Sequence, residues 1–376
     1  MMKKIVFNSA MAVCLALLAS CAGSEHKGDC VEITVDIHRQ GKITDFIKSM
    51  DGYVFLETND SSILQRIDKL RLENDTIYIA DRDVLQMFGR KDGKWLGKID
   101  RQGRGPGEYY YISDFDVYDS GIYILSGNKI IIYDSDATAK RTIQLDDWFN
   151  RLLVQEDGTI WLYSGNSNET RYNYVLIDPS DGKTKSKYDY FSEPRGFGFS
   201  DNYPFCGEVS GTIYTSKYFD NIMYSLTSED YKPSYQFDVN LEHIVTQEEL
   251  SSLNYKELGD KYRNKESFRQ VRYVGKDRQT MFADLYCFLD EGGLMDCLVK
   301  TNLKTGEVHS YLVNKAVDPA FPLFDSGDIE GYDGKTVISS IYASWAKEQG
   351  KKYGFEDLAA ISEYDNPVLV FHTLNY

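Results

Sequence analysis

The sequence predicts an all-β protein, a β-propeller built from four-stranded antiparallel blades. Short strands rich in aromatic and β-branched residues alternate with turns of Asp, Gly, Asn and Ser along most of the chain. An apolar and aromatic pair recurs, beginning at Ile77, Ile122, Ile160 and Ile213. This spacing of about 40 to 50 residues is typical of propeller blades. The pattern breaks near 245–270, where a helical insertion is expected.

The N-terminus predicts export. Lys3 and Lys4 precede an apolar run that is shorter than the ~20 residues needed by a membrane-spanning helix, so residues 1–20 are predicted as a signal peptide. The segment Leu18-Ala19-Ser20-Cys21 resembles the lipobox of bacterial lipoproteins, which implies that Cys21 is acylated and becomes the first mature residue. The alternative is a secreted protein with an unmodified cysteine. We expect residues 21–42 to form a tether and an N-terminal strand, and residues 43–376 to form the propeller.

Composition limits the partners. The net charge of the 376-residue chain is −16, and such a surface repels phosphate backbones, so we expect no nucleic-acid partner. Four of the six cysteines lie beyond Cys21, too few for a disulfide scaffold, and a chain of this length can bury a core without one.

The inserted helix has recognisable ends. Thr246 and Glu249 form a capping-box pattern, and the leucines that follow make a rough apolar stripe. We expect the whole insertion to occupy about 245–276. A second helical patch is expected around 356–364, before a final strand "PVLVFHTL".

Three stretches suggest a family. "FLETNDSSILQRIDKL" (55–70), "GRGPGEY" (103–109) and "DNPVLVFHTL" (365–374) resemble the six-bladed β-propeller lipoproteins of gut-type Gram-negative bacteria, which are similar to NHL-repeat propellers. Length alone allows six or seven blades, and the resemblance implies six. It also implies a lipid-anchored envelope protein, expected at the outer membrane. It carries no catalytic residues over to this chain.

The resemblance implies that "GRGPGEY" joins the outer strand of one blade to the inner strand of the next. Gly105 and Gly107 would supply unusual φ values or close backbone approach, and Tyr109 would anchor the joint in the core. The alternative hypothesis is that Arg104 or Glu108 contacts a ligand.

Cys287 and Cys297 flank the sequence "DEGGL". If this is a hairpin turn centred on Gly292, the two cysteines face one another directly across the strands. A disulfide between them is then one prediction, and two reduced thiols packed as small hydrophobes are the alternative.

No catalytic or metal motif stands out. The five histidines are scattered without zinc spacing, the Asp-rich turns lack the calcium-loop pattern, and no G-x-S-x-G elbow occurs. We therefore expect no metal and no cofactor.

The candidate ligand residues lie in loops. Arg195 and Tyr203 belong to "EPRGFGFSDNYPF" (193–205), and Arg272 to "SFRQVRYVGKDR" (267–278). Aromatic and guanidinium groups recognise sugars and peptides. The alternative is that these side chains are ordinary solvent-exposed surface residues.

These observations predict a non-enzymatic envelope lipoprotein, anchored to the membrane by lipid. Its propeller would bind a glycan, a peptide or an envelope protein through loops at one end of the channel. The alternative is a lactonase-like, metal-dependent hydrolase or lyase acting on a carbohydrate-derived substrate. That alternative requires three or four Asp, Glu, Asn or His side chains clustered at the channel mouth.

Overall fold

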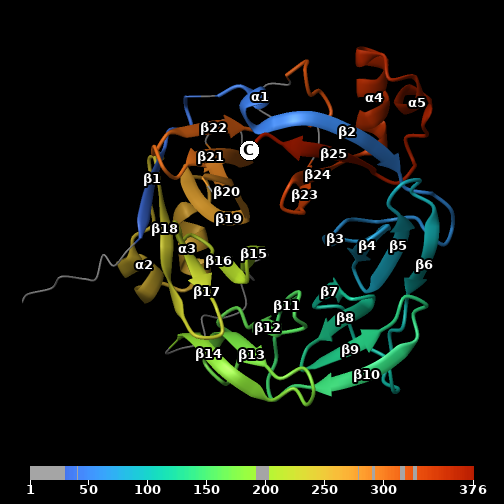
Figure 1. Cartoon of the computed structure of the whole chain (residues 1–376), viewed down its shortest axis with the longest axis vertical. Coiled ribbons are helices and arrows are strands. Elements are labelled where there is room, and N and C mark those ends of the chain that lie inside the picture. Colours follow the sequence, from blue (N-terminus) through green and yellow to red (C-terminus); the bar gives the residue numbers. More distant parts are fainter. Residues whose placement is uncertain are drawn as a thin grey trace, which may run out of the picture.

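The computed structural model describes residues 30–39, 41–191, 203–277, 279–289, 293–313, 318–324 and 328–376, apart from the side chain of Tyr255. Within these residues the strands form six sheets, arranged as blades around a central channel (Figure 1). The predicted six-bladed β-propeller is confirmed.

The first three blades follow one another along the chain, each ordered from the channel outwards. Blade 1 contains β3 (Lys69–Glu73), β4 (Thr76–Asp81), β5 (Val84–Gly89) and β6 (Trp95–Ile99). Blade 2 contains β7 (Asp114–Tyr118), β8 (Gly121–Ser126), β9 (Lys129–Tyr133) and β10 (Ala139–Gln144). Blade 3 contains β11 (Arg151–Val154), β12 (Ile160–Tyr163), β13 (Tyr172–Ile177) and β14 (Thr184–Tyr190).

The next two blades keep this order, with one addition. Blade 4 contains β15 (Phe205–Val209), β16 (Thr212–Ser216), β17 (Ile222–Leu226) and β18 (Tyr231–Val239). The N-terminal strand β1 (Val31–Val35) pairs in parallel with β18 as a fifth, outermost strand of this blade. Blade 5 contains β19 (Ser267–Lys276), β20 (Thr280–Leu289), β21 (Gly293–Asn302) and β22 (Val308–Leu312).

Blade 6 closes the ring by combining both ends of the propeller sequence. Its three inner strands are β23 (Asp328–Tyr332), β24 (Thr336–Ile341) and β25 (Val368–Leu374). Its outermost strand is β2 (Ile47–Phe55), which pairs antiparallel with β25. The expected final strand is therefore present, and it lies inside its sheet rather than at the edge.

The recurring apolar and aromatic pairs mark the same place in four blades. They fall on β4, β8, β12 and β16, the second strand of blades 1 to 4. Ile77, Ile122, Ile160 and Ile213 are all fully buried. The repeat was visible in the sequence because this strand is covered on both faces, and only apolar side chains can be buried there at little cost.

Among the described residues, one short helix precedes β2, and the other helices lie in two insertions. The short helix is α1 (Ile43–Phe46), the first insertion carries α2 (Gln247–Ser252) and α3 (Tyr255–Tyr262), and the second carries α4 (Ala343–Tyr353) and α5 (Glu356–Ala360). The predicted capping box is present, because the Glu249 amide donates to the Thr246 hydroxyl and the Thr246 amide donates to the Glu249 carboxylate. Leu253 is extended, so the predicted single helix is two. Helix α4 was not predicted from the sequence. The side chain of its N-cap residue, Tyr342, makes no capping hydrogen bond.

The prediction that Cys287 and Cys297 face one another across the blade 5 hairpin is wrong. The hairpin closes with Leu289 opposite Gly293, which places Cys287 opposite Met295. Cys297 lies opposite Leu285. The observed partner of each cysteine is therefore two residues away from the predicted one. Both thiols are buried and free.

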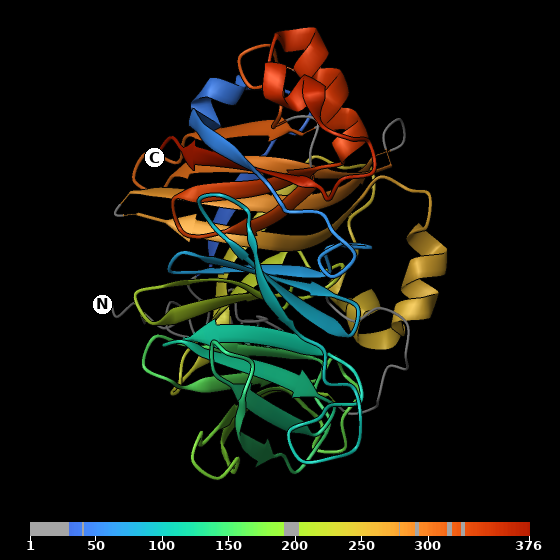
Figure 2. The ribbon, with the colours of Figure 1, turned by 90° about the vertical axis from the view of Figure 1, so that its right-hand side faces the viewer.

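The two faces of the disc differ in the length of their connections. On one face, which we call the short-turn face, tight turns join the first and second strands of each blade and the third and fourth strands of blades 1 to 5. The other, the long-loop face, carries the blade-to-blade connections and the turns between second and third strands. It includes both helical insertions, at 240–266 and 342–367. Figure 2 shows α2 and α3 projecting from one face of the disc.

The stretch "GRGPGEY" joins β6 to β7 on the long-loop face, as predicted. Tyr109 is fully buried, and its hydroxyl donates to the carbonyls of Asp83 (2.8 Å) and Ile99 (3.0 Å). Gly107 has a φ of +72°, and a Cβ there would lie 2.6 Å from the Cβ of Ala139. The joint therefore requires glycine at this position for both conformation and space.

Candidate ligand-binding channel and long-loop face

A cavity of about 1270 Å³ occupies the centre of the ring. Residues from all six innermost strands line it, and many of them are charged. The innermost strand of each blade borders this cavity, so charged side chains there contact water and one another. The charged groups of this wall and those of the adjoining interface between blades 5 and 6 form two different arrangements.

The wall formed by blades 1 to 3 is a ladder of paired charges. In the first rung, the Lys69 ammonium on β3 lies 2.8 Å from an Asp114 carboxylate oxygen on β7. The other oxygen of Asp114 accepts the amide of Leu152 on β11, at 2.9 Å. One carboxylate therefore links the inner strands of three blades.

A second rung repeats this two residues further along each strand. Arg71 Nε lies 2.9 Å from Asp116 Oδ1, and Asp116 Oδ2 accepts the amide of Val154 at 2.9 Å. Side chains two residues apart on a strand point to the same face, which explains why both rungs enter the channel wall. We call these two rungs the blade 1–3 ladder.

The buried interface between blades 5 and 6, beside the channel, is arranged differently. Arg272 on β19 lies 2.6 Å from an oxygen of Asp296 on β21, and it also donates to the carbonyl of Ile329 at 2.6 Å. A second carboxylate, Asp284 on β20, lies 3.7 Å from Arg272 Nε. Together with Glu330 on β23, these residues form what we call the Arg272 cluster.

Aromatic rings enclose the Arg272 guanidinium. Its central carbon lies 4.8 Å from the ring centre of Tyr203, 5.1 Å from that of Tyr286 and 5.7 Å from that of Tyr273. The structure thus brings together two predicted ligand residues, Tyr203 and Arg272. Arg272 is buried in a strand rather than displayed on a loop, so its contacts are those of a structural residue.

The carboxyls of this cluster have perturbed acidity. Burial, and then the charge of Asp296, raise the pKa of Asp284 well above its usual range, and neither oxygen of its carboxyl has a hydrogen-bond partner. Burial also raises the pKa of Glu330 to about 7. Glu330 accepts a 2.5 Å hydrogen bond from the Ser340 hydroxyl.

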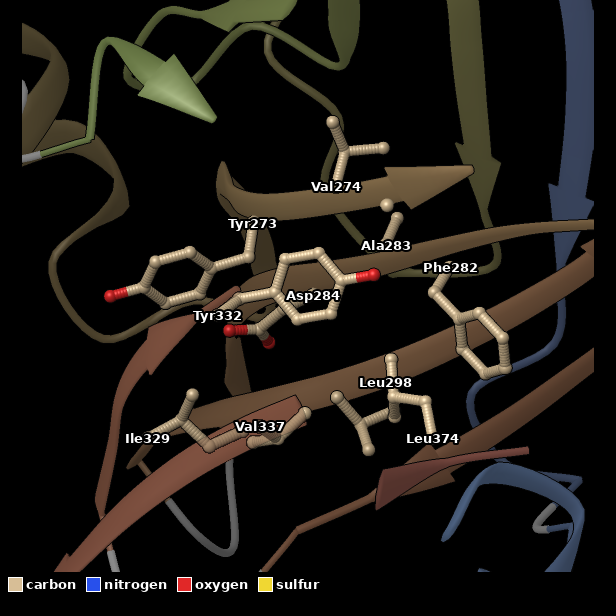
Figure 3. A pocket seen from close by; sticks show the side chains of 11 residues that line it. Tyr273, Val274, Phe282, Ala283, Asp284, Leu298, Ile329, Tyr332, Val337 and Leu374 are labelled. Carbon is tan, nitrogen blue, oxygen red and sulfur yellow. The ribbon is translucent and has the colours of Figure 1, made fainter. Parts of the chain in front are cut away.

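A small cavity of about 20 Å³ adjoins the cluster between blades 5 and 6 (Figure 3). Its lining is mostly apolar, with Asp284, Tyr273 and Tyr332 as the polar exceptions. That volume suits one water molecule, so the cavity is no substrate site.

The remaining predicted site residues do not meet in the channel. Glu108 belongs to the blade joint, where its carboxylate accepts the amide of Gly105 at 2.7 Å. Arg104 is exposed beside it. Arg195 and Cys21 lie outside the described residues.

Exposed aromatic side chains gather on the long-loop face. In the described part of the chain, the aromatic residues with largely exposed side chains are Tyr110, Tyr111, Trp148, Tyr190, Tyr342, Trp345 and Tyr364. Each lies in a connection of this face or at the strand end that enters one. Sequence reasoning missed all of them, because the chain has 29 tyrosines and no pattern separates the exposed from the buried ones.

Two further features bear on the predictions. Among the described residues, no three His, Cys, Asp or Glu side chains lie close enough to hold one metal ion. Over the same residues, no helix has the length and apolarity to cross a membrane.

The fold and channel define the chain as a six-bladed β-propeller. Its sequence matches the family described as a domain of unknown function (DUF4934) over residues 30–373, and the chain belongs to this family. No curated protein sequence matches it significantly.

Two solved structures share the fold. One is a Bacteroides fragilis NCTC 9343 protein assigned as exported, with 16% identity and a TM-score of 0.68 over 92% of this chain and 100% of that one. The other is a DUF4221-family protein from Bacteroides vulgatus, with 11% identity and a TM-score of 0.50 over 87% of this chain and 97% of that one. At these identities the likeness concerns the fold.

Proposed function

We propose that this protein is an exported, non-enzymatic binding protein of the cell envelope, which engages a glycan, a peptide or a protein partner on its long-loop face. The observation that carries the proposal is the gathering of exposed aromatic residues on that face. Loops held by a rigid scaffold are common binding surfaces, and aromatic rings contribute large contact area at low entropic cost.

The paired charges in and beside the channel favour ligand binding by the surrounding loops over binding in the channel. Lys69 and Arg71 each have a carboxylate partner, and Arg272 has two nearby. Groups paired in this way hold the blades together. We therefore assign the channel wall mainly to structure, and recognition to the loops around its mouth.

Export is part of the proposal. The Bacteroides fragilis structure is assigned as exported, and the N-terminal Leu18 to Cys21 segment has the lipobox pattern. We propose that Cys21 carries the lipid anchor. Labelling cells with a tagged fatty acid should mark the wild-type protein and leave Cys21→Ser unmarked, whereas equal labelling of both proteins would exclude the anchor.

The binding face is tested with immobilised arrays of oligosaccharides and peptides. For any ligand found, covalent surface footprinting should show protection of exposed aromatics on the long-loop face, such as Tyr111 and Trp345. The short turns at 74–75 and 119–120 serve as the internal control, because they lie on the opposite face. Protection of those turns instead, or chemical turnover of the ligand, would overturn the proposal.

A further inference from the structure

One part of the long-loop face combines exposed aromatic rings with neighbouring cations. It lies on the blade 2 side of the channel mouth and is formed by two blade joints and the turn that precedes β9. Its members are Arg104, Tyr110, Lys129 and Trp148, which we call the Trp148 platform. It is separate from the channel wall, although Tyr111, next to Tyr110, lines the cavity.

The indole of Trp148 lies directly against the Gly127 turn. Gly127 has a φ of +63°, and a Cβ there would lie 2.4 Å from an atom of the indole ring. Glycine at this position thus lets the ring rest on the backbone. The side chain is nevertheless 56% exposed, so an outer surface remains available to a ligand.

Tyr110 is the second exposed ring, at 51%. The Lys129 ammonium lies 5.3 Å from its ring centre, and the Arg104 guanidinium lies 6.0 Å from it. Lys129 is held in place because it donates to the carbonyl of Glu108 at 2.7 Å. That carbonyl belongs to the rigid joint anchored by Tyr109. Ligand binding would therefore cost little conformational entropy in this part of the platform.

The charges of Arg104 and Lys129 are the next feature of the platform. In the part of the chain that the structure describes, neither Arg104 nor Lys129 forms an ion pair with a carboxylate. The protein as a whole carries a net charge of −16. Two neighbouring cations without carboxylate partners on such a protein favour an anionic ligand.

We propose that the Trp148 platform binds an acidic oligosaccharide, one that contains uronic acid residues. The apolar face of a pyranose ring would stack on Trp148, and a sugar carboxylate would interact with Lys129 and Arg104. An oligosaccharide fits better than an acidic peptide, because the platform presents flat rings rather than a pocket for side chains. The inference rests on the proposed function and specifies its ligand class.

The test is calorimetric titration of the protein with hexagalacturonate, with neutral cellohexaose and with hexaglutamate. We expect the wild-type protein to bind hexagalacturonate and to bind it more weakly as salt increases. Trp148→Ala should weaken binding at least tenfold. Lys129→Ala and Arg104→Ala should each weaken it several-fold and reduce the dependence on salt.

Matched controls exist elsewhere on the molecule. Leu96→Ala removes an apolar side chain of similar exposure, 57%, on the outer strand β6 of blade 1. Lys187→Ala removes an ammonium 5.6 Å from the ring of Tyr172. Both controls should bind hexagalacturonate like the wild type, and melting temperatures should verify that every variant is folded.

The outcomes separate the two proposals. Unchanged binding by Trp148→Ala and Lys129→Ala would overturn the platform, while footprinting could still support the long-loop face. Binding of hexaglutamate or cellohexaose in preference to hexagalacturonate would overturn the ligand class. Failure of the wild type to bind hexagalacturonate would do the same. Footprints on the short-turn face would overturn the proposed function itself.

Discussion

The blade 1–3 ladder in the channel wall and the Arg272 cluster between blades 5 and 6 both link neighbouring blades, but with a different charge balance. In the ladder, each cation meets one carboxylate, and each carboxylate also accepts a backbone amide. In the cluster, one guanidinium lies near two buried carboxylates, and Asp284 accepts no hydrogen bond. Each cation of the ladder is matched by one carboxylate, whereas the cluster has a single cation for two buried carboxyl groups.

Burial explains why this difference matters. The side chains of Lys69 and Arg71 are 26% and 34% exposed, and although those of Asp114 and Asp116 are only 3% and 5% exposed, all four line the central cavity, from which water can replace a lost partner. The side chain of Arg272 is 10% exposed, and those of Asp284 and Asp296 are 5% and 9% exposed. A carboxyl left in such surroundings must either remain charged at high energetic cost or take up a proton.

The largest expected effect comes from Arg272→Met. This change leaves two buried carboxylates without their cation, and removal of one partner of a buried ion pair typically costs about 3–5 kcal/mol. We expect the free energy of unfolding in urea to fall by this amount. The double variant Arg272→Met/Asp296→Asn should recover part of the loss. A loss no greater than that of the ladder variants below would show that the two arrangements are energetically alike.

The next effect concerns pH and Glu330. Burial raises the pKa of this carboxyl from 4.5 to about 7 in the folded protein, so folding favours its protonated form. Its contribution to stability is complete below pH 4.5 and is lost as the pH rises through about 7. At 1.36 kcal/mol per pKa unit, the loss is about 3 kcal/mol.

Glu330→Gln isolates this contribution, because the amide oxygen can still accept from Ser340. We expect the decrease in unfolding free energy between pH 5 and pH 8 to be smaller in Glu330→Gln than in the wild type. Parallel pH profiles for the two proteins would contradict the assignment.

A smaller effect is expected in the ladder, from Asp116→Asn. The substitution removes the charge that faces Arg71 but keeps one oxygen to accept the amide of Val154. We expect a loss of about 1–3 kcal/mol, which is typical of one impaired charged hydrogen bond. Chemical denaturation of the wild type and the variant measures it. An effect as large as that of Arg272→Met would remove the distinction between the two arrangements.

The smallest effect is expected from Lys69→Met. Asp114 keeps the hydrogen bond from the Leu152 amide, and although its side chain is only 3% exposed, it lines the central cavity, from which water can reach its other oxygen. We expect a change below about 1 kcal/mol, which should diminish further in high salt. A loss above 3 kcal/mol would mean that the ladder is as intolerant of missing charge as the Arg272 cluster.

Local patterns made much of the fold predictable. The buried second strands of blades 1 to 4, the capping box at Thr246 and the joint at Gly107 all depend on residues close together in sequence, so their signals survive without tertiary information. The predicted register of the Cys287 hairpin was wrong by two residues, because the sequence "DEGG" contains several residues able to occupy the centre of a turn. The helix α4 escaped notice because it lacks a side-chain cap.

The candidate site was less predictable. Arg272 and Tyr203 were identified by residue type, but the sequence places them 69 positions apart and says nothing of Asp296 or Asp284 beside them. Trp148 and Gly127 likewise come from different connections of the long-loop face. These partners meet only because the blades are packed side by side.

By itself the sequence determined the fold class, the position of the first helical insertion and the nature of the "GRGPGEY" joint, since periodic burial and glycine conformation are properties of short segments. Tertiary structure alone decided which charges are paired, which aromatic rings stay exposed and which face collects them. Those properties depend on ring closure, which brings six inner strands and their connections together from distant parts of the chain.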